Sequence, residues 1–414
     1  MTHSIRDVRP SSDARTGDDA AGVPRRVVAC VDTGVDDALA LAYLLASPDE
    51  CELLGVVCGY GNVGADAALR NTRIVLDLFG RADVPVLRGS DHPSWADAFI
   101  PDAGCAQFHG ADGLGGFAAR MADMTRSPIV SPDTAVPVAS AASVASAASA
   151  ASDAAVVSVG GYPLGDPHAN PAVEAPADAV VANPGQVEAI ADDEAPEGVR
   201  FLVEQARRYG KGLTMLATGP LTDVDAAIRL APDIVDGLTI AMMGGSLTQP
   251  GNCWDAVAET NVIQDPEAAD RVFHAGADVT MVGLDVTHRC LLPRSAAERW
   301  RDTGTARGRF LAAIADFSIT ANREADPVSF AGGMPLHDPL AAAVALDPTL
   351  VSCFDIALRA ERATGDFTGV RGRTTGDPAG LVTPDAPRVH VALDVDVRRF
   401  TDGFTARLAA LCTD

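Results

Sequence analysis

The stretch RRVVACVDTGVDDALALAYLLA, residues 25–46, decides the fold. An apolar run of strand length begins abruptly, ends in carboxylates and is followed at once by a helical pattern of apolar residues. The residues before it, 1–25, are polar and charged and show no apolar period. We therefore expect a disordered tail over 1–25 and a fold that begins near Arg26.

The same succession of apolar strand and amphipathic helix repeats along the chain. Strands are predicted at 27–31, 53–57, near 86, and at 213–217, 238–243, 279–282, 355–359 and 389–395. Helices are predicted at 37–45, 65–79, 196–209, 221–230, 266–275, twice within 294–322, after 338 and at 398–411. The alternation predicts an α/β fold: one domain over 26–414 with a mostly parallel, open, Rossmann-like sheet, flanked by helices and joined by right-handed crossovers.

One segment breaks this rhythm. Between Arg126 and Arg200 the chain has ten acidic residues and no Lys or Arg, and it contains the run ASAASVASAASAASDAA at 139–155. Small side chains bury too little apolar area to offset the entropy of ordering, so we expect a disordered insertion over about 128–194. A short helix through the Ala-rich part is the alternative, because Ala is the best helix former.

Charge and composition exclude several partners. The formal net charge of -24 repels phosphate backbones and anionic lipids, so we expect no nucleic-acid or membrane partner. The chain shows neither a membrane-spanning apolar run nor a secretory signal, which favours a cytoplasmic protein. Its eight cysteines are scattered, and we expect reduced, mostly buried thiols; a disulfide framework is the alternative.

An acidic turn follows the first strand. Asp32, Asp36 and Asp37 stand within six residues at the predicted start of a helix, and Gly34 between them allows a tight or left-handed turn. Helix capping accounts for one of these carboxylates, or two, but not for three. Three crowded carboxylates repel one another unless a cation neutralises them, and an all-oxygen set favours calcium or magnesium.

The run VDTGVDDALAL resembles the N-terminal signature of the inosine-uridine preferring nucleoside hydrolase family, whose usual form is Asp-Xaa-Asp-Pro-Gly-Xaa-Asp-Asp-Ala. Further blocks follow in the family's order: GYGNVGADAALRNT (59–72), FHGADGLGG (108–116), LATGPLTD (216–223), MMGGSLTQPGN (242–252), AETNVIQDPEAA (258–269), VTMVGLDVTH (279–288) and LHDPLAA (336–342). The chain departs from the pattern in having Cys30 for the first Asp, Thr33 for Pro, and the Ala-rich insertion.

The resemblance implies calcium-dependent hydrolysis of ribonucleosides to ribose and free base, in nucleoside salvage, by a homodimer or homotetramer. It implies a Ca²⁺ ion held by Asp32, by Asp37 as a bidentate ligand, by Asp338 and by the carbonyl of Thr218. Asp32 is also the candidate general base. For Asp338 alone, capping of a helix with Pro at its first position is an equally good local explanation.

The resemblance assigns the remaining residues to the two ends of a nucleoside. Asp36 would accept from the ribose 2'-hydroxyl, and the residues Asn62, Asn252, Glu259, Asn261 and Met243 would surround the rest of the sugar. His109 and His337 would face the base, with His337 the better candidate acid, which suits a pyrimidine or a mixed inosine/uridine preference. Trp254 is either a base-stacking lid or a packed loop aromatic.

Two other functions are considered. A metal-dependent phosphohydrolase would also use an acidic turn after a first strand, but it needs a cation near the phosphate, and Lys211 is the single lysine. A nonenzymatic calcium- or nucleoside-binding protein on the same scaffold would be consistent with Cys30 and Thr33. Such a protein would be expected to have lost at least one of the implied catalytic residues, and none is lost.

Overall fold

The computed structural model describes residues 23–101, 103–117, 190–191, 194–253, 257–363, 370–382 and 384–413. The described residues all fall in one compact unit. Residues 1–22 of the predicted tail and nearly all of the predicted insertion lie outside them, so the disorder expected there stays a prediction. Arg25, the last residue of the predicted tail, is already in the first strand. At the end of that insertion, Ile190 already packs against the hydrophobic core.

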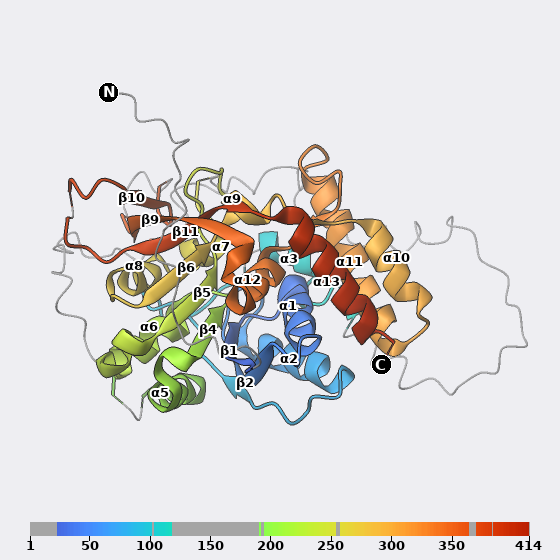
Figure 1. Cartoon of the computed structure of the whole chain (residues 1–414), viewed down its shortest axis with the longest axis horizontal. Helices are drawn as coiled ribbons and strands as arrows, with labels where there is room; N and C mark the ends of the chain where they lie inside the picture. Colours follow the sequence, from blue (N-terminus) through green and yellow to red (C-terminus); the bar gives the residue numbers. More distant parts are fainter. Residues whose placement is uncertain are drawn as a thin grey trace, which may run out of the picture. The chain divides into compact units, whose positions relative to one another are not determined.

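A nine-stranded sheet in the order β10-β9-β11-β6-β5-β4-β1-β2-β3 runs through this unit (Figure 1). Its strands are β1 (Arg25–Val31), β2 (Cys51–Cys58), β3 (Val86–Arg88), β4 (Leu213–Ala217), β5 (Thr239–Met243), β6 (Asp278–Val282), β9 (Val351–Ala360), β10 (Thr374–Asp377) and β11 (Val389–Val395). The strands from β3 to β11 in this order are all parallel to one another. Strand β9 pairs antiparallel with β11, and β10 pairs antiparallel with β9. The predicted α/β fold with a mostly parallel, open sheet is confirmed.

Helices cover both faces of the sheet. One layer contains α5 (Glu197–Tyr209), α6 (Thr222–Leu230) and α8 (Pro266–His274), which contact one another in succession. The other layer is built around α1 (Val35–Leu45) and α12 (His337–Leu346), which pack on each other. It also contains α2 (Ala65–Leu78), α10 (Arg294–Asp302), α11 (Ala306–Ala325) and α13 (Val397–Leu411).

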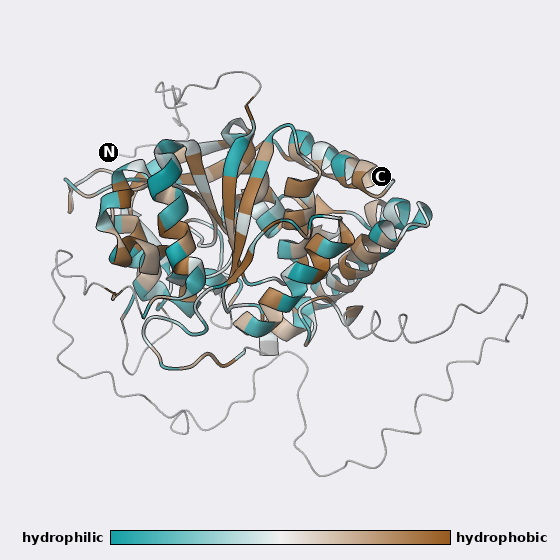
Figure 2. Ribbon diagram, turned by 90° about the horizontal axis from the view of Figure 1, so that it is seen from below, coloured by the Kyte–Doolittle hydropathy of each residue, from teal (hydrophilic) through white to brown (hydrophobic). Residues whose placement is uncertain are grey.

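The strands between these layers are apolar on both faces, as Figure 2 shows by their brown colour between helices with teal outer faces. In β1 the side chains of Val28 and Cys30 belong to the core on the α5–α6–α8 side, together with Leu202 and Phe273. Burial on both faces explains why this strand reads as a continuous apolar run and not as an alternating one.

The sequence missed several short elements. These are α3 (Ala103–His109), α7 (Thr260–Gln264), α9 (Leu284–Thr287), β10, and the two-residue strands β7 (Leu291–Leu292) and β8 (Met334–Pro335), which pair with each other. They are too short, or too polar, to show a period of their own.

The acidic turn is also more helical than predicted. Helix α1 begins at Val35 rather than at about 37, so Asp36 and Asp37 lie in its first turn. Gly34 has φ -92°, so of the two predicted alternatives, a tight or a left-handed turn, the left-handed one does not occur. Close packing explains the glycine instead, because a Cβ here would lie 2.3 Å from His109 Nδ1 and 2.9 Å from Asn62 Nδ2.

Two further findings concern the chain as a whole. No helix among the described residues is long and apolar enough to cross a membrane. All eight cysteines are free thiols, and those at 30, 51, 58, 105, 290 and 412 are buried, which confirms the expected reduced state.

The topology places a ligand site next to β1. From β1 the chain goes to β2 on one side, while β4 pairs on the other side. In open α/β sheets, ligands bind beyond the carboxyl ends of the strands at such a reversal of direction. The residues that follow β1 and β4 there are Asp32 and Thr218.

Candidate active site

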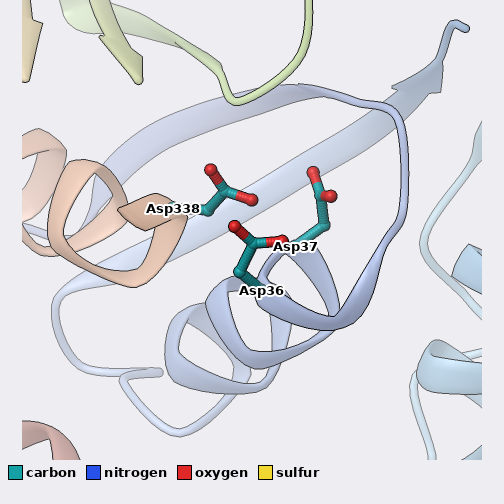
Figure 3. A group of neighbouring side chains, drawn as sticks. All are labelled: Asp36, Asp37 and Asp338. Atoms are coloured by element: carbon teal, nitrogen blue, oxygen red, sulfur yellow. The ribbon is translucent and has the colours of Figure 1, made fainter. Parts of the chain in front are cut away.

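Three carboxylates meet at this point. Asp36 and Asp37 come from the first turn of α1, and Asp338 comes from the first turn of α12. One oxygen from each lies within 4.8 Å of the others. Figure 3 shows the three side chains facing one another between the two helices. All three are buried, since α1 and α12 pack on each other directly.

Hydrogen bonds fix Asp37 within this group. Its Oδ2 accepts from the N–H of Gly34 at 2.8 Å, which closes the first turn of α1. Its Oδ1 accepts from the hydroxyl of Thr218 at 2.7 Å. Since Thr218 follows β4 directly, this bond ties the helix to the end of the neighbouring strand.

The other two carboxylates are incompletely satisfied. Asp36 Oδ1 and Asp338 Oδ2 are buried and have no hydrogen-bond partner among the described residues. Burial raises the pKa of Asp36 to about 6. Burial, together with the charges of its acidic neighbours, also raises the pKa of Asp338. Leaving such oxygens unpaired is costly. A hard divalent cation would bind Asp338 Oδ2 and neutralise the charge of the group, so this all-oxygen donor set fits the implied metal.

Asp32 lies beside this group and is held by Asn62. The backbone N–H of Asn62 donates to Asp32 Oδ2 at 2.6 Å, and its side-chain amide donates to Asp32 Oδ1 at 3.1 Å and to Asp37 Oδ2 at 3.3 Å. Burial and the charge of Asp37 raise the pKa of Asp32. At Gly61 a Cβ would lie 1.8 Å from Asp32 Oδ2, so only glycine lets the loop approach this carboxylate.

The predicted sugar-binding residues come together after β5. Asn261 donates its amide to the carbonyls of Thr218 at 2.7 Å and Met243 at 3.1 Å, which orients its own carbonyl oxygen away from both. Glu259 Oε2 accepts from three backbone N–H groups and caps α7, and burial raises the pKa of Glu259 to about 7. Asn252 Oδ1 accepts from Thr260, so its amide nitrogen is the atom left for a substrate.

The two predicted base-side histidines lie near the carboxylates but in different settings. His109, the last residue of α3, accepts the N–H of Val35 at Nδ1, at 3.2 Å, and that nitrogen is 3.4 Å from Asp36 Oδ1. Because Nδ1 accepts, it carries no proton toward Asp36. Burial lowers the pKa of His109 to about 4, so the ring is neutral at neutral pH.

His337 immediately precedes Asp338, and its Nδ1 lies 2.8 Å from the hydroxyl of Thr287. Burial lowers the pKa of His337, as do the nearby His288 and His109. His288 was not predicted as a site residue, although it ends the block VTMVGLDVTH. Its ring lies 5.5 Å from that of His337 and packs edge-on against Phe330. Trp254 lies outside the described residues.

Comparisons with known proteins agree over nearly the whole chain. The model of the inosine-uridine preferring nucleoside hydrolase family matches residues 27–402. The pyrimidine-specific ribonucleoside hydrolase RihA of Citrobacter koseri is 31% identical over 379 residues, covering 91% of this chain and 96% of that protein. RihA of an Enterobacter species is 30% identical with the same coverage. The solved purine-preferring ribonucleoside hydrolase of Gardnerella vaginalis is 34% identical, with a TM-score of 0.70, over 94% of this chain and 99% of that one.

Proposed function

The chain belongs to the inosine-uridine preferring nucleoside hydrolase family, and from that premise we propose that it is a calcium-dependent ribonucleoside hydrolase of nucleoside salvage with a pyrimidine or mixed inosine/uridine preference. Members of the family are enzymes that cleave N-glycosidic bonds, and this chain is one of them. The observation that carries the calcium proposal is the buried group of Asp36, Asp37 and Asp338, two of whose oxygens have no partner among the described residues.

In this proposal Asp32, Asp37, Asp338 and the carbonyl of Thr218 hold the cation. Bound there, Ca²⁺ would acidify the attacking water and orient the sugar. The hydroxyl of Thr218 supports this assignment, because its hydrogen bond holds Asp37 at the carboxyl end of β4, next to the Thr218 carbonyl. Asp36, whose Oδ1 has no hydrogen-bond partner among the described residues, would accept from the ribose 2'-hydroxyl.

Asp32 would act as the general base. Its two oxygens are oriented by Asn62, and its burial gives the carboxyl a raised pKa, both of which suit a group that must receive a proton from water. Asn261 would face the sugar with its carbonyl oxygen, since two backbone carbonyls hold its amide. Met243, Asn62, Asn252 and Glu259 would complete the ribose site.

His337 would assist departure of the base as a neutral hydrogen-bond donor. When the hydroxyl of Thr287 donates to Nδ1, the proton of the ring is on Nε2, the nitrogen that remains for the base. The lowered pKa of His337 favours this neutral form over an imidazolium ion. His109 would complete the base side through the nitrogen not used by Val35.

Two relatives are named as pyrimidine-specific and one solved relative as purine-preferring, so substrate choice is the property to measure. The purified full-length protein is offered inosine, uridine, cytidine, adenosine and their 2'-deoxy forms, with CaCl₂ or with a chelator, and released reducing sugar is assayed. We expect ribose from uridine, with or without activity on inosine, and no release under chelation.

Each other outcome has a meaning. Faster release from purine nucleosides would contradict the base preference, and undiminished release in chelator would contradict calcium dependence. Tight nucleoside binding without ribose would favour the nonenzymatic alternative. No observation favours the phosphohydrolase. A cytoplasmic location and a homodimer or homotetramer stay predictions.

A further inference from the structure

Asn71 is a buried amide that no role described so far explains, although it lies in the block GYGNVGADAALRNT. It sits in α2 with no exposed surface. Its Nδ2 donates to two backbone carbonyls, that of Thr33 at 3.0 Å and that of Asp112 at 2.8 Å. The reverse orientation of the amide would set its oxygen against both carbonyls. Asn71 Oδ1 is buried and has no hydrogen-bond partner among the described residues. Burying an unpaired oxygen costs free energy, so the two bonds made by the amide nitrogen must offset that cost.

The two carbonyls belong to the two halves of the candidate active site. Thr33 stands between Asp32 and the first turn of α1, so its carbonyl is part of the acidic turn. Asp112 lies three residues beyond His109, and its side chain holds its own loop by accepting from the N–H groups of Leu114 at 3.0 Å and Gly116 at 2.8 Å. A shift of that loop would therefore move His109.

The same two segments also touch directly. A Cβ at Gly113 would lie 2.7 Å from Asn71 Nδ2 and 3.0 Å from the carbonyl of Thr33, so the loop, the turn and the amide are packed without spare space. His109 makes a second connection by accepting the N–H of Val35 at 3.2 Å. Asn71 and His109 thus join the same two segments.

We propose that Asn71 is a positioning residue that sets the separation between the acidic turn and His109. This rests on the proposed function, in which His109 faces the departing base. The substitution Asn71→Leu keeps the approximate volume and removes both donors, and Asn71→Ser keeps one hydroxyl should the leucine variant not fold. The matched control is Asp77→Asn, at an exposed position of the same helix, which leaves both carbonyl bonds intact.

The experiment measures kcat and KM on uridine, whose base needs assistance to leave, and on 4-nitrophenyl riboside, whose phenolate does not. Calorimetry gives the affinity for Ca²⁺, and circular dichroism gives the folded fraction. We expect the Asn71 variants to lose kcat on uridine by at least about tenfold, with the loss on the nitrophenyl substrate and in Ca²⁺ affinity under about threefold. Asp77→Asn should not change the ratio of the two kcat values.

A double variant sharpens the test. If Asn71 acts through His109, Asn71→Leu combined with His109→Ala should be no slower on uridine than His109→Ala alone, because the two losses are not independent. Equal losses on both substrates, fully additive losses in the double variant, or no loss at all would overturn the proposal. Failure of the proposed function has a different signature, namely absence of ribose release by the unaltered protein.

Discussion

The hydroxyl groups of Thr33 and Thr72 lie 2.6 Å apart in the interior of the fold, with both residues fully buried. Cys58 extends this contact by donating its thiol to Thr72 Oγ1 at 3.2 Å. Position 33 is one of the two places where the signature of this chain differs from that of its family. The hydroxyl of the threonine at this position ties the acidic turn to α2.

This pair predicts a coupled effect on stability. Thr33→Val and Thr72→Val should each lower the free energy of unfolding by about 1–2 kcal/mol, since each leaves the other hydroxyl buried without its partner. The double variant should lose less free energy of unfolding than the two single variants together, because neither hydroxyl of the pair remains to be left unpaired. Urea unfolding of all four proteins measures the coupling. Strict additivity would show that the two hydroxyls do not interact.

The ion pair between α6 and α8 should contribute far more than a surface pair. Arg271 donates to both oxygens of Asp225, at 2.8 and 2.7 Å, and the Asp225 side chain is 3% exposed. Arg271→Met leaves that carboxylate buried, so we expect a loss of about 3 kcal/mol in the free energy of unfolding. The control is Arg207→Met, whose pair with Asp233 is exposed on both sides and should cost less than about 1 kcal/mol. Similar losses for both would contradict this account.

Glu259 should make stability depend on pH. Its pKa is about 7 in the fold against an ordinary value of 4.5, so its contribution is fully present below pH 4.5 and declines as the pH rises to about 7. Between pH 4.5 and pH 7 the free energy of unfolding of the unaltered protein should therefore fall by roughly 3 kcal/mol relative to that of Glu259→Gln. Denaturant unfolding of both chelator-treated proteins at several pH values measures this difference. A difference that does not vary with pH would mean that the fold leaves the pKa of Glu259 at its ordinary value.

Two acidic positions should separate cation binding from turnover. At 100 times its dissociation constant, Ca²⁺ should raise the free energy of unfolding by about 2.7 kcal/mol. Asp338→Asn should abolish this gain, whereas Asp32→Asn should keep part of it and lose turnover. Asp402→Asn, at an exposed carboxylate of α13, is the control. Calorimetry with CaCl₂ and thermal unfolding provide the readouts; unchanged affinity in Asp338→Asn would remove it from the ligand set.

His337→Ala should act on the leaving group. We expect a loss of about 10²-fold or more in kcat for uridine and a much smaller loss for 4-nitrophenyl riboside, because the phenolate leaves without a hydrogen bond. His390→Ala is a matched control on β11, where that histidine binds Asp355 and Asp278 on neighbouring strands. Equal losses on the two substrates would argue against assistance by His337.

The sequence was most informative where side chains interact with the core. The strand at 213–217 is predicted to the residue, because all five side chains are buried and the run contains no charged residue, glycine or proline. Strand β10, Thr374–Asp377, was missed because its four residues include a glycine and an aspartate at the edge of the sheet. Helix α1 was begun two residues too late because Val35 and Asp36 were assigned to the turn before it.

At the site, the order of the matched blocks placed Asp338 with the acidic turn. The function of Asn71 could not be foreseen in the same way. Its partners are two backbone carbonyls, and a carbonyl is present at every position of a sequence, so no residue pattern reveals which ones meet. Asp285 is a similar case, since it accepts from the backbone N–H groups of Leu247, Thr248 and Gln249 in a remote loop.

The separation of the carboxylates along the chain has a consequence for biogenesis. Asp36 and Asp37 leave the ribosome early, whereas Asp338 emerges only after three hundred further residues have been translated. A nascent polypeptide that stops short of α12 has two of the three acids and no enclosure around them. If Asp37 and Asp338 bind calcium as proposed, the metal site would be complete only once α12 has been synthesised, and prematurely terminated products would not compete with the finished enzyme for calcium.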